Sequence, residues 1–481
     1  MGNAHTAYDQ RHANSLIGCL VVATTVMILN ETVLSVALPA MMSDFSITAD
    51  VAQWLSTGFM LTMSVIIPVT GYIQKVLPTR TIFFLSMGLF LIGSLVAALA
   101  PAFGVVLAGR ILQACGTAMM MPLLMTVVLT VVEPARRGAM MGIISVAIAV
   151  APTVGPTLSG FVLSFATWHW LFWIMVVLSL IVGVGGAKLL INVGETERAP
   201  LDILSVLLSA VGFGGLVYAL SSMSAALQSG NPTPIVCAVV GVLALAVFAW
   251  WQRRLLDGRG PLLDLRVLTY RNFALGLTAI LCGFGVLIGA AMVIPLYLQG
   301  ALGVSEFVTG LVVLPGGLLQ GVVSPFIGRL YDRCGPRPIA IPGAVLLCLG
   351  VWAFVLVAPL GSVPLVVVAH VIMAVGMGFV MTPMMSAALG VLPEKLYSHG
   401  SAVLNTLQQL AGAAGTALLI AMMTLGQSMA ANRGIEDPAG LLSFGTQMAF
   451  TVGGGLTVVV LLLTLWVRRP EDQEEAANTP A

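Results

Sequence analysis

Long apolar stretches, separated by short polar segments, are the feature that most constrains the fold of this chain. A helix needs about 20 predominantly apolar residues to cross a bilayer, and we count fourteen such stretches in the 481 residues. They lie at about 16–40, 51–72, 80–99, 104–130, 138–162, 169–191, 203–222, 233–251, 272–298, 306–327, 339–359, 362–388, 400–425 and 445–467. Only 8% of the residues are charged, against about 25% in soluble domains. The sequence therefore predicts an all-α integral membrane protein with fourteen transmembrane helices.

The distribution of basic residues predicts how these helices are oriented in the membrane. If the N-terminus is cytoplasmic, all but two of the 20 Lys and Arg residues fall in cytoplasmic segments. The exceptions are Arg110, inside a span, and Arg433, on the outer side of the membrane. The positive-inside rule therefore predicts that both termini are cytoplasmic. The net charge of +1 excludes a protein that binds nucleic acid by electrostatic attraction.

A weak internal repeat predicts how the chain is divided. Arg110 lies six residues before Gly116, and His370 lies six residues before Gly376 in a later apolar stretch. Two related six-helix halves are typical of transporters, which hold their substrate near the midplane between the halves. The predicted segments are a cytoplasmic N-terminus (1–15), a first half (16–191), a linker with two inserted helices and a basic segment (192–271), a second half (272–467) and an acidic cytoplasmic tail (468–481).

Two opposite charges stand inside apolar stretches. Arg110 keeps its charge at any physiological pH, and a charge at membrane depth is costly, so it normally has a partner and a function. Glu31 is an acid in a comparable setting. Counted from the outer ends of their helices at 1.5 Å per residue, the two lie within a few ångströms of the same depth. This pattern points to a transporter that handles protons or charged solutes, although a static structural ion pair is the alternative.

Four motifs carry a family resemblance. They read LNETVLSVALP at 29–39, GRILQACG at 109–116, APTVGPTLSG at 151–160 and GRLYDRCGPR at 328–337. These elements, and the chain as a whole, resemble the major facilitator superfamily. The similarity is greatest to its fourteen-helix drug:proton antiporters of the EmrB/QacA type, within them to the lincomycin-resistance branch.

The resemblance implies a major facilitator fold and a role for each motif. Glu31 would be the proton site and Arg110 its partner, with the departure that the usual Asp of the first motif is replaced here by Asn30. The third motif marks antiporters, and the fourth would form a cytoplasmic gate in which Asp332 and neighbouring arginines make a charge clasp. That gate element normally follows the second helix, where Gly71 is kept but the Asp is missing. The antiporter residues are Pro152, Gly155, Pro156 and Gly160, and the gate residues are Gly328, Asp332, Arg333, Gly335 and Arg337.

Further polar residues inside the spans are candidates for lining a substrate cavity. Asn405, Gln408 and Gln409 share one helix face and either contact substrate or bond neighbouring helices. Tyr297 is an interfacial anchor or a cavity wall, and His370 either titrates near neutral pH or is structural. Asn30 and Gln113 complete the candidates.

The sequence thus predicts a proton-coupled antiporter that exports amphipathic drugs or toxic compounds by alternating access. It would be a monomer in a bacterial cell membrane, with the bilayer, protons and a small amphipathic substrate as its partners. The proton gradient would be the energy source, with no cofactor or metal. Export of an endogenous lipid, fatty acid or metabolite is the alternative, and an uptake symporter is disfavoured by the antiporter motif. The sequence lacks the P-loop of an ATP-driven motor, the polar cluster of a membrane enzyme and the repeated charges of a channel.

Overall fold

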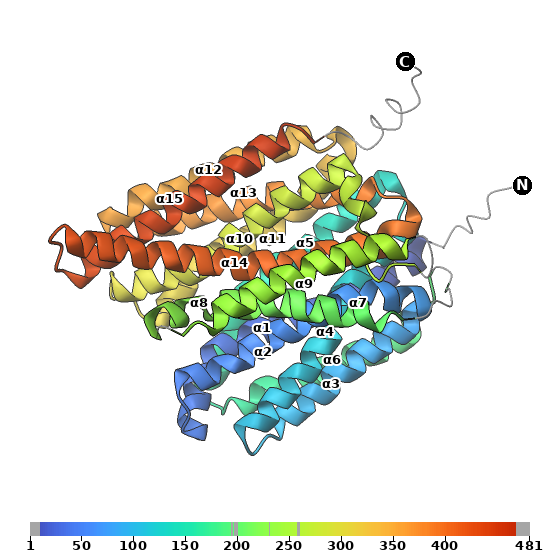
Figure 1. Cartoon of the computed structure of the whole chain (residues 1–481), viewed down its shortest axis with the longest axis horizontal. Helices are drawn as coiled ribbons and strands as arrows, with labels where there is room; N and C mark the ends of the chain where they lie inside the picture. Colours follow the sequence, from blue (N-terminus) through green and yellow to red (C-terminus); the bar gives the residue numbers. More distant parts are fainter. Residues whose placement is uncertain (1–9, 194–195, 197–200, 230, 257–259, 468–481) are drawn as a thin grey trace, which may run out of the picture.

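The protein is a bundle of long helices (Figure 1). The computed structural model describes residues 10–193, 196, 201–229, 231–256 and 260–467, and these residues contain helices and no strand. Fourteen of the helical spans are long and apolar enough to cross a membrane, which confirms the number predicted from the sequence. The acidic tail 468–481 and most of the predicted N-terminal segment lie outside the described residues.

The first six helices pack mainly on one another and are called the first group. In this group α3 packs on α4, and α1 packs on α5 and α6. The seam between α3 and α4 is lined with glycine, and a Cβ added to Gly109 would lie 2.7 Å from the carbonyl oxygen of Gly93. Small residues of this kind allow the backbones of membrane helices to approach closely. The group comprises α1 (Gln10–Phe45), α2 (Ala49–Val76), α3 (Thr79–Ala98), α4 (Phe103–Val131), α5 (Arg137–Leu163) and α6 (His169–Leu189).

The last six long helices form the second group. Here α10 packs on α13, α14 and α15, and α12 packs on α13. Glycine again permits the closest contacts, since a Cβ added to Gly289 would lie 2.7 Å from the carbonyl oxygen of Gly415. The group comprises α10 (Arg271–Gly300), α11 (Glu306–Cys334), α12 (Arg337–Val357), α13 (Val363–Gly390), α14 (Tyr397–Asn432) and α15 (Pro438–Thr464).

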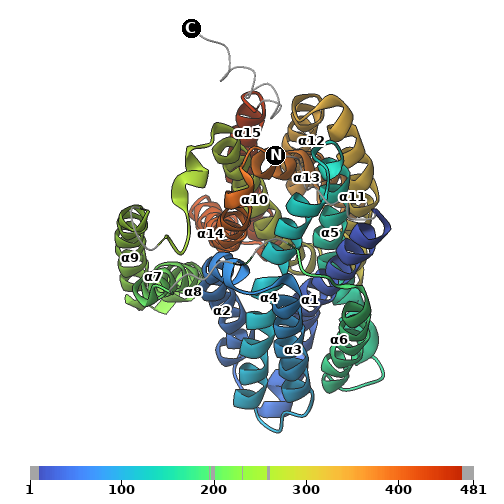
Figure 2. The same cartoon turned by 90° about the vertical axis from the view of Figure 1, so that its right-hand side faces the viewer.

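Between the two groups the chain forms inserted helices that lie on one flank of the bundle (Figure 2). They are α7 (Ile203–Ser209), the π-helical turn η2 (Ala210–Gly214), α8 (Gly215–Ser229) and α9 (Thr233–Leu255). The first predicted inserted helix is therefore interrupted by a π turn. These helices contact α2 of the first group and α14 of the second, so the insert touches both groups. Four short 3-10 turns complete the fold: η1 (Pro134–Arg136), η3 (Leu265–Thr269), η4 (Ala358–Leu360) and η5 (Glu394–Leu396).

Because the number of spans is even, α1 begins and α15 ends at the same end of the bundle (Figure 1). We call this the terminal end, and the sequence predicts that it faces the cytoplasm. The two groups meet through α5 on α11, α2 on α14, and the contacts of α4 with α14 and of α5 with α13. We call these contacts the joint. They include close approaches of Gly138 to Gly328 and of Gly142 to Ser324, which lie in the turns of α5 and α11 nearest the terminal end.

Candidate functional site

Arg110 is enclosed within the first group. It projects from α4, and its side chain is 1% exposed. The guanidinium lies 4.2 Å from the ring centroid of Phe59 on α2 and donates a hydrogen bond from Nη1 to Oε1 of Gln113 (3.0 Å). Its Nε has no hydrogen-bond partner among the described residues. An enclosed cation over an aromatic face gains electrostatic stabilisation from the ring, but the Nε–H of Arg110 remains available for a further hydrogen bond.

Gln113 is the central member of this polar cluster. It is fully buried, and its Oε1 also accepts a hydrogen bond from Nδ2 of Asn30 on α1 (3.1 Å). Its Nε2 donates to Oγ of Ser94 on α3 (2.8 Å) and to Oδ1 of Asn30 (3.4 Å). One amide therefore joins three helices and fixes the position of the guanidinium, because each of its polar atoms has a partner.

Glu31 lies on α1 beside this cluster and interacts electrostatically with Arg110. No nitrogen–oxygen distance within 4.0 Å joins the two charges in the part of the chain that the structure describes. The structure therefore brings Glu31 and Arg110 into the same region without a direct ion pair. Asn30, which stands at the position of the family's usual acid, bonds instead to Gln113.

The antiporter motif in α5 packs directly against α1. Thr32, the neighbour of Glu31, donates from its hydroxyl to the carbonyl oxygen of Ala151 (3.4 Å). A Cβ on Gly155 would collide with the side chain of Thr32, whereas a Cβ on Gly160 would meet nothing within 4 Å. Both Pro152 and Pro156 lie inside an uninterrupted α5. The contact between Gly155 and Thr32 places the motif beside the candidate proton site.

The gate motif holds the two groups together at the terminal end. The carboxylate of Asp332, in the last turn of α11, accepts hydrogen bonds from the backbone N–H groups of Gly138 (2.7 Å) and Ala139 (2.9 Å) in the first turn of α5. Gly328 meets Gly138 backbone to backbone. Asp332 therefore binds the N-terminus of α5, and a charge clasp between Asp332 and the neighbouring arginines stays a prediction.

The other gate residues shape the turn after α11. Gly335 has a positive φ of 76° and ends α11, which a residue with a side chain rarely tolerates. Arg337 donates from Nε to the carbonyl oxygen of Val467 (2.7 Å) and so ties the start of α12 to the residues that follow α15. Arg333 is exposed.

The polar residues of α14 contribute to the joint. Nδ2 of Asn405 donates to the sulfur of Met125 on α4 (3.3 Å), and Nε2 of Gln409 donates to the sulfur of Met63 on α2 (3.4 Å). Gln408 is 7% exposed. Asn405 and Gln409 therefore link the groups in this conformation, and both contacts use the weak acceptor of a thioether.

Tyr297 and His370 serve packing contacts in this conformation. The hydroxyl of Tyr297, which is buried, donates to the carbonyl oxygen of Ala358 (2.7 Å) and holds α10 against η4. His370 on α13 is 6% exposed, and a Cβ on Gly316 of α11 would collide with its ring. The structure brings neither residue to Arg110.

Two residues of the site carried no clear sequence signal. Phe59 and Ser94 contact Arg110 and Gln113, respectively, but phenylalanine and serine occur throughout the spans. Only the polarity of Ser94 within an apolar helix would have marked it, and several other serines share that property.

Comparisons with known proteins agree with this architecture. The family model described as Major Facilitator Superfamily matches residues 20–416. A lincomycin resistance protein (LmrB) of Listeria monocytogenes is 38% identical over 94% of this chain and 96% of its own length, and that of Bacillus subtilis is 37% identical over 94% and 95%. The solved structure of the human organic anion transporter MFSD10 superimposes with a TM-score of 0.66 at 16% identity and covers 94% of this chain and 99% of its own.

These findings confirm the resemblance drawn from the four motifs, and the fold with fourteen apolar spans is that of a membrane-embedded transporter of small substrates. The match of the family model over most of the spans and the identity to full-length relatives lead to the same conclusion. The chain belongs to the major facilitator superfamily.

Proposed function

We propose that this protein is a proton-coupled antiporter that exports amphipathic drugs or other toxic compounds from the cytoplasm of a bacterium. The observation that carries the proposal is the buried Arg110, which acts electrostatically on Glu31 without a direct ion pair. Relatives named lincomycin resistance proteins over almost the whole chain support a drug as the cargo.

In the coupling step, the unpaired Nε–H of Arg110 becomes available to the carboxylate of Glu31. In this conformation the guanidinium is held by Gln113 and Phe59, and Glu31 is free to carry a proton. When Glu31 loses the proton, its carboxylate attracts the guanidinium, and the attraction pulls α1 toward α4. Proton loading and release thereby change the packing between α1, α4 and the antiporter motif of α5.

The energy for export comes from the membrane potential and the pH gradient. One elementary charge that crosses 100 mV supplies about 2.3 kcal/mol. The joint closes the predicted cytoplasmic end in this conformation, since α5 and α11 pack together there. Export requires the joint to open so that cargo can enter from the cytoplasm.

The test is the Glu31→Gln variant in proteoliposomes loaded with a pH-sensitive dye. Lincomycin and a series of amphipathic cations would first be screened for reduced susceptibility in cells that overproduce the protein, with and without a proton uncoupler. Addition of an identified cargo should then move protons in the wild type and not in Glu31→Gln. Glu133→Gln, the same chemical change at an exposed acid, is the control. Full drug-driven proton movement in Glu31→Gln would remove Glu31 from the mechanism.

A further inference from the structure

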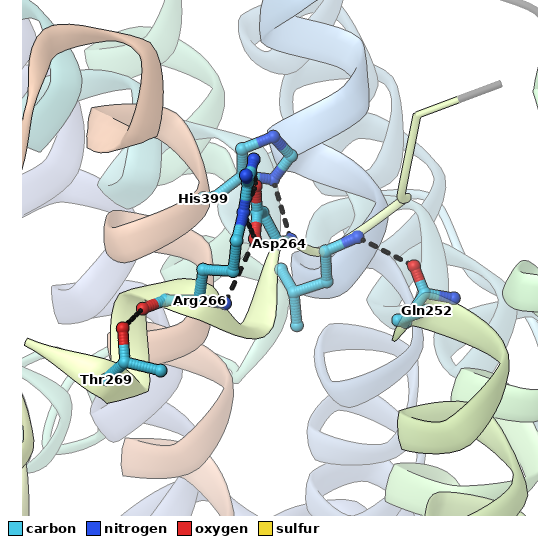
Figure 3. A network of polar contacts seen from close by, with 6 residues as sticks. Gln252, Asp264, Arg266, Thr269 and His399 are labelled. Atoms are coloured by element: carbon cyan, nitrogen blue, oxygen red, sulfur yellow. Dashed lines mark hydrogen bonds and ion pairs between the residues drawn. The ribbon is translucent and has the colours of Figure 1, made fainter. Parts of the chain in front are cut away.

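The segment between the inserted helices and α10 is docked into the terminal end of the bundle. Residues 260–270, which we call the elbow, lie outside the spans, yet Leu262, Leu263, Asp264 and Val267 are at most 3% exposed. The carboxylate of Asp264 accepts hydrogen bonds from the side chain of Arg266 (2.7 to 3.1 Å) and from its backbone N–H (3.0 Å). Figure 3 shows this pair lying between α14 and the end of α9.

Hydrogen bonds connect the elbow to the inserted helices. The backbone N–H of Leu263 donates to Oε1 of Gln252 in the last turns of α9 (3.2 Å). Nε2 of Gln252 donates to Oγ of Ser205 (2.6 Å), and that hydroxyl donates to Asp202, which caps α7. The insert and the elbow therefore form one hydrogen-bonded unit.

This unit is bound at its elbow by His399, in the first turn of α14. The backbone N–H of Asp264 donates to Nδ1 of His399 (3.2 Å; Figure 3). Because Nδ1 accepts a hydrogen bond, it carries a lone pair, and the ring is neutral with its proton on Nε2. That Nε2 has no hydrogen-bond partner among the described residues, and the side chain is 1% exposed.

His399 also lies at the joint between the groups. A Cβ placed on Gly71 of α2 would lie 3.5 Å from Nδ1 of His399 and 3.6 Å from Cβ of Ala402, so α14 lies close to α2 at the ring. The charged groups that act on the ring are Lys75 of α2 and Asp264 and Arg266 of the elbow. The only anion of these three is already bonded to Arg266.

We propose that His399 is a second proton-binding site, at which protonation releases the elbow and opens the joint between α2 and α14. A proton on Nδ1 removes the acceptor for the N–H of Asp264, and the two donors then face each other. The new positive charge also repels Lys75 on α2. Both effects act on the two surfaces that His399 holds together, so the protonated ring is stable only when the elbow and α2 have moved away and water reaches it.

The consequence is a conformational equilibrium that responds to the pH at the terminal end. A hydrated imidazole has a pKa of about 6.5, so the open conformation takes up the proton as the pH falls to mildly acidic values, and the closed one does not. By linkage, the ratio of open to closed molecules should rise about tenfold between pH 8 and pH 5.5. This inference goes beyond the proposed export function, because it needs neither cargo nor Glu31.

The experiment measures the distance across the joint by electron–electron resonance of spin labels on Thr81 and Lys395. Both positions are exposed at the terminal end, one in each group, and the native cysteines would be replaced. Purified full-length protein would be measured without drug from pH 8 to pH 5.5. The population of long distances should rise about tenfold relative to the short ones. A distance distribution that does not change with pH would overturn the proposal.

Two substitutions of His399 sharpen the test. His399→Asn places an amide oxygen where Nδ1 accepts and cannot take up a proton, so it should stay closed at every pH. His399→Lys places a permanent cation there and should stay open. If the protein with His399→Asn opens with acid as the wild type does, another group is responsible. The same measurement in Glu31→Gln should keep the pH response, which separates this site from the proposed coupling pair.

Discussion

The carboxylate of Asp332 caps the helix that begins beside Gly138, with the backbone N–H of Gly138 only 2.7 Å from Oδ1. The acid belongs to the last turn of α11 and the N–H to the first turn of α5, so a helix of one group is capped by a side chain of the other. A negative charge at a helix N-terminus is favoured by the unpaired N–H groups and the helix dipole. Opening of the joint must therefore uncover the first turn of α5.

Removal of this cap should weaken the closed conformation. Asp332→Ala takes away two hydrogen bonds and a charge at a helix N-terminus, which is worth about 1 kcal/mol, so the ratio of open to closed molecules should rise about fivefold. The distance between labels on Thr81 and Lys395 measures this ratio. Asp437→Ala is the matched control, because Asp437 caps α15 at the far end of the bundle, and it should leave the ratio unchanged.

The two glycines of the antiporter motif should differ in their tolerance of alanine. Gly155→Ala places a methyl group against Thr32 beside Glu31, and the steric conflict should push α5 from α1 and impair drug resistance in cells at normal expression. Gly160→Ala meets open space and should be as active as the wild type. Equal loss in both variants would show that the motif requires glycine for a reason other than this contact.

Gln113 should control how firmly Arg110 is held. Gln113→Ala leaves the guanidinium without its observed hydrogen bond and leaves the amide of Asn30 with neither of its contacts to Gln113. The freed Arg110 should then pair directly with Glu31, and drug-driven proton movement in proteoliposomes should fall at least tenfold. Ser94→Ala removes a single bond to Gln113 and should have a much smaller effect. A reversed order of the two variants would contradict the assigned role.

While the elbow is docked, the carboxylate of Asp264 should contribute a stability that does not vary between pH 5 and pH 8. Burial acts to raise the pKa of Asp264, but hydrogen bonds from Arg266 and its positive charge outweigh burial and hold the pKa below the usual value of an aspartate. The stabilisation is therefore complete above the ordinary carboxyl range and is lost only as the pH falls through the lowered pKa. In the His399→Asn background, in which the elbow should stay docked at every pH, Asp264→Asn should lower the thermal midpoint in detergent by a similar amount at pH 5 and at pH 8. A difference that shrinks between these values would show that Asp264 titrates in this range.

The sequence predicted the helical fold because each membrane helix can be recognised from its own stretch of sequence. Every span needs its own apolar stretch, and fourteen were found where fourteen were predicted. Boundaries were less accurate: α1 continues through Pro39 to Phe45 and α14 runs to Asn432, because helices extend beyond the hydrocarbon where polar residues are tolerated. The similar depth of Glu31 and Arg110 followed from helix geometry alone.

The partners of the polar residues could not be predicted in the same way. Asn405 and Gln409 share a face by periodicity, but their thioether partners on α4 and α2 depend on how the two groups close. The docking of Asp264 on His399 joins residues 135 positions apart. The basic residues around the elbow are expected in any cytoplasmic loop by the positive-inside rule. They therefore gave no sign that the side chains of the elbow would be buried.

The sulfur acceptors opposite Gln409 and Asn405 have a mechanical consequence. Thioethers are weak hydrogen-bond acceptors, so these two contacts align α14 with α4 and α2 but add little adhesion. A carrier must separate and rejoin the same surfaces on every turnover, and strong bonds between α14 and the first group would slow that separation. The contacts that resist separation lie instead at Asp332 near the terminal end and between the hydroxyls of Thr382 on α13 and Ser145 on α5, so α5 resists the opening of the joint more than α14 does.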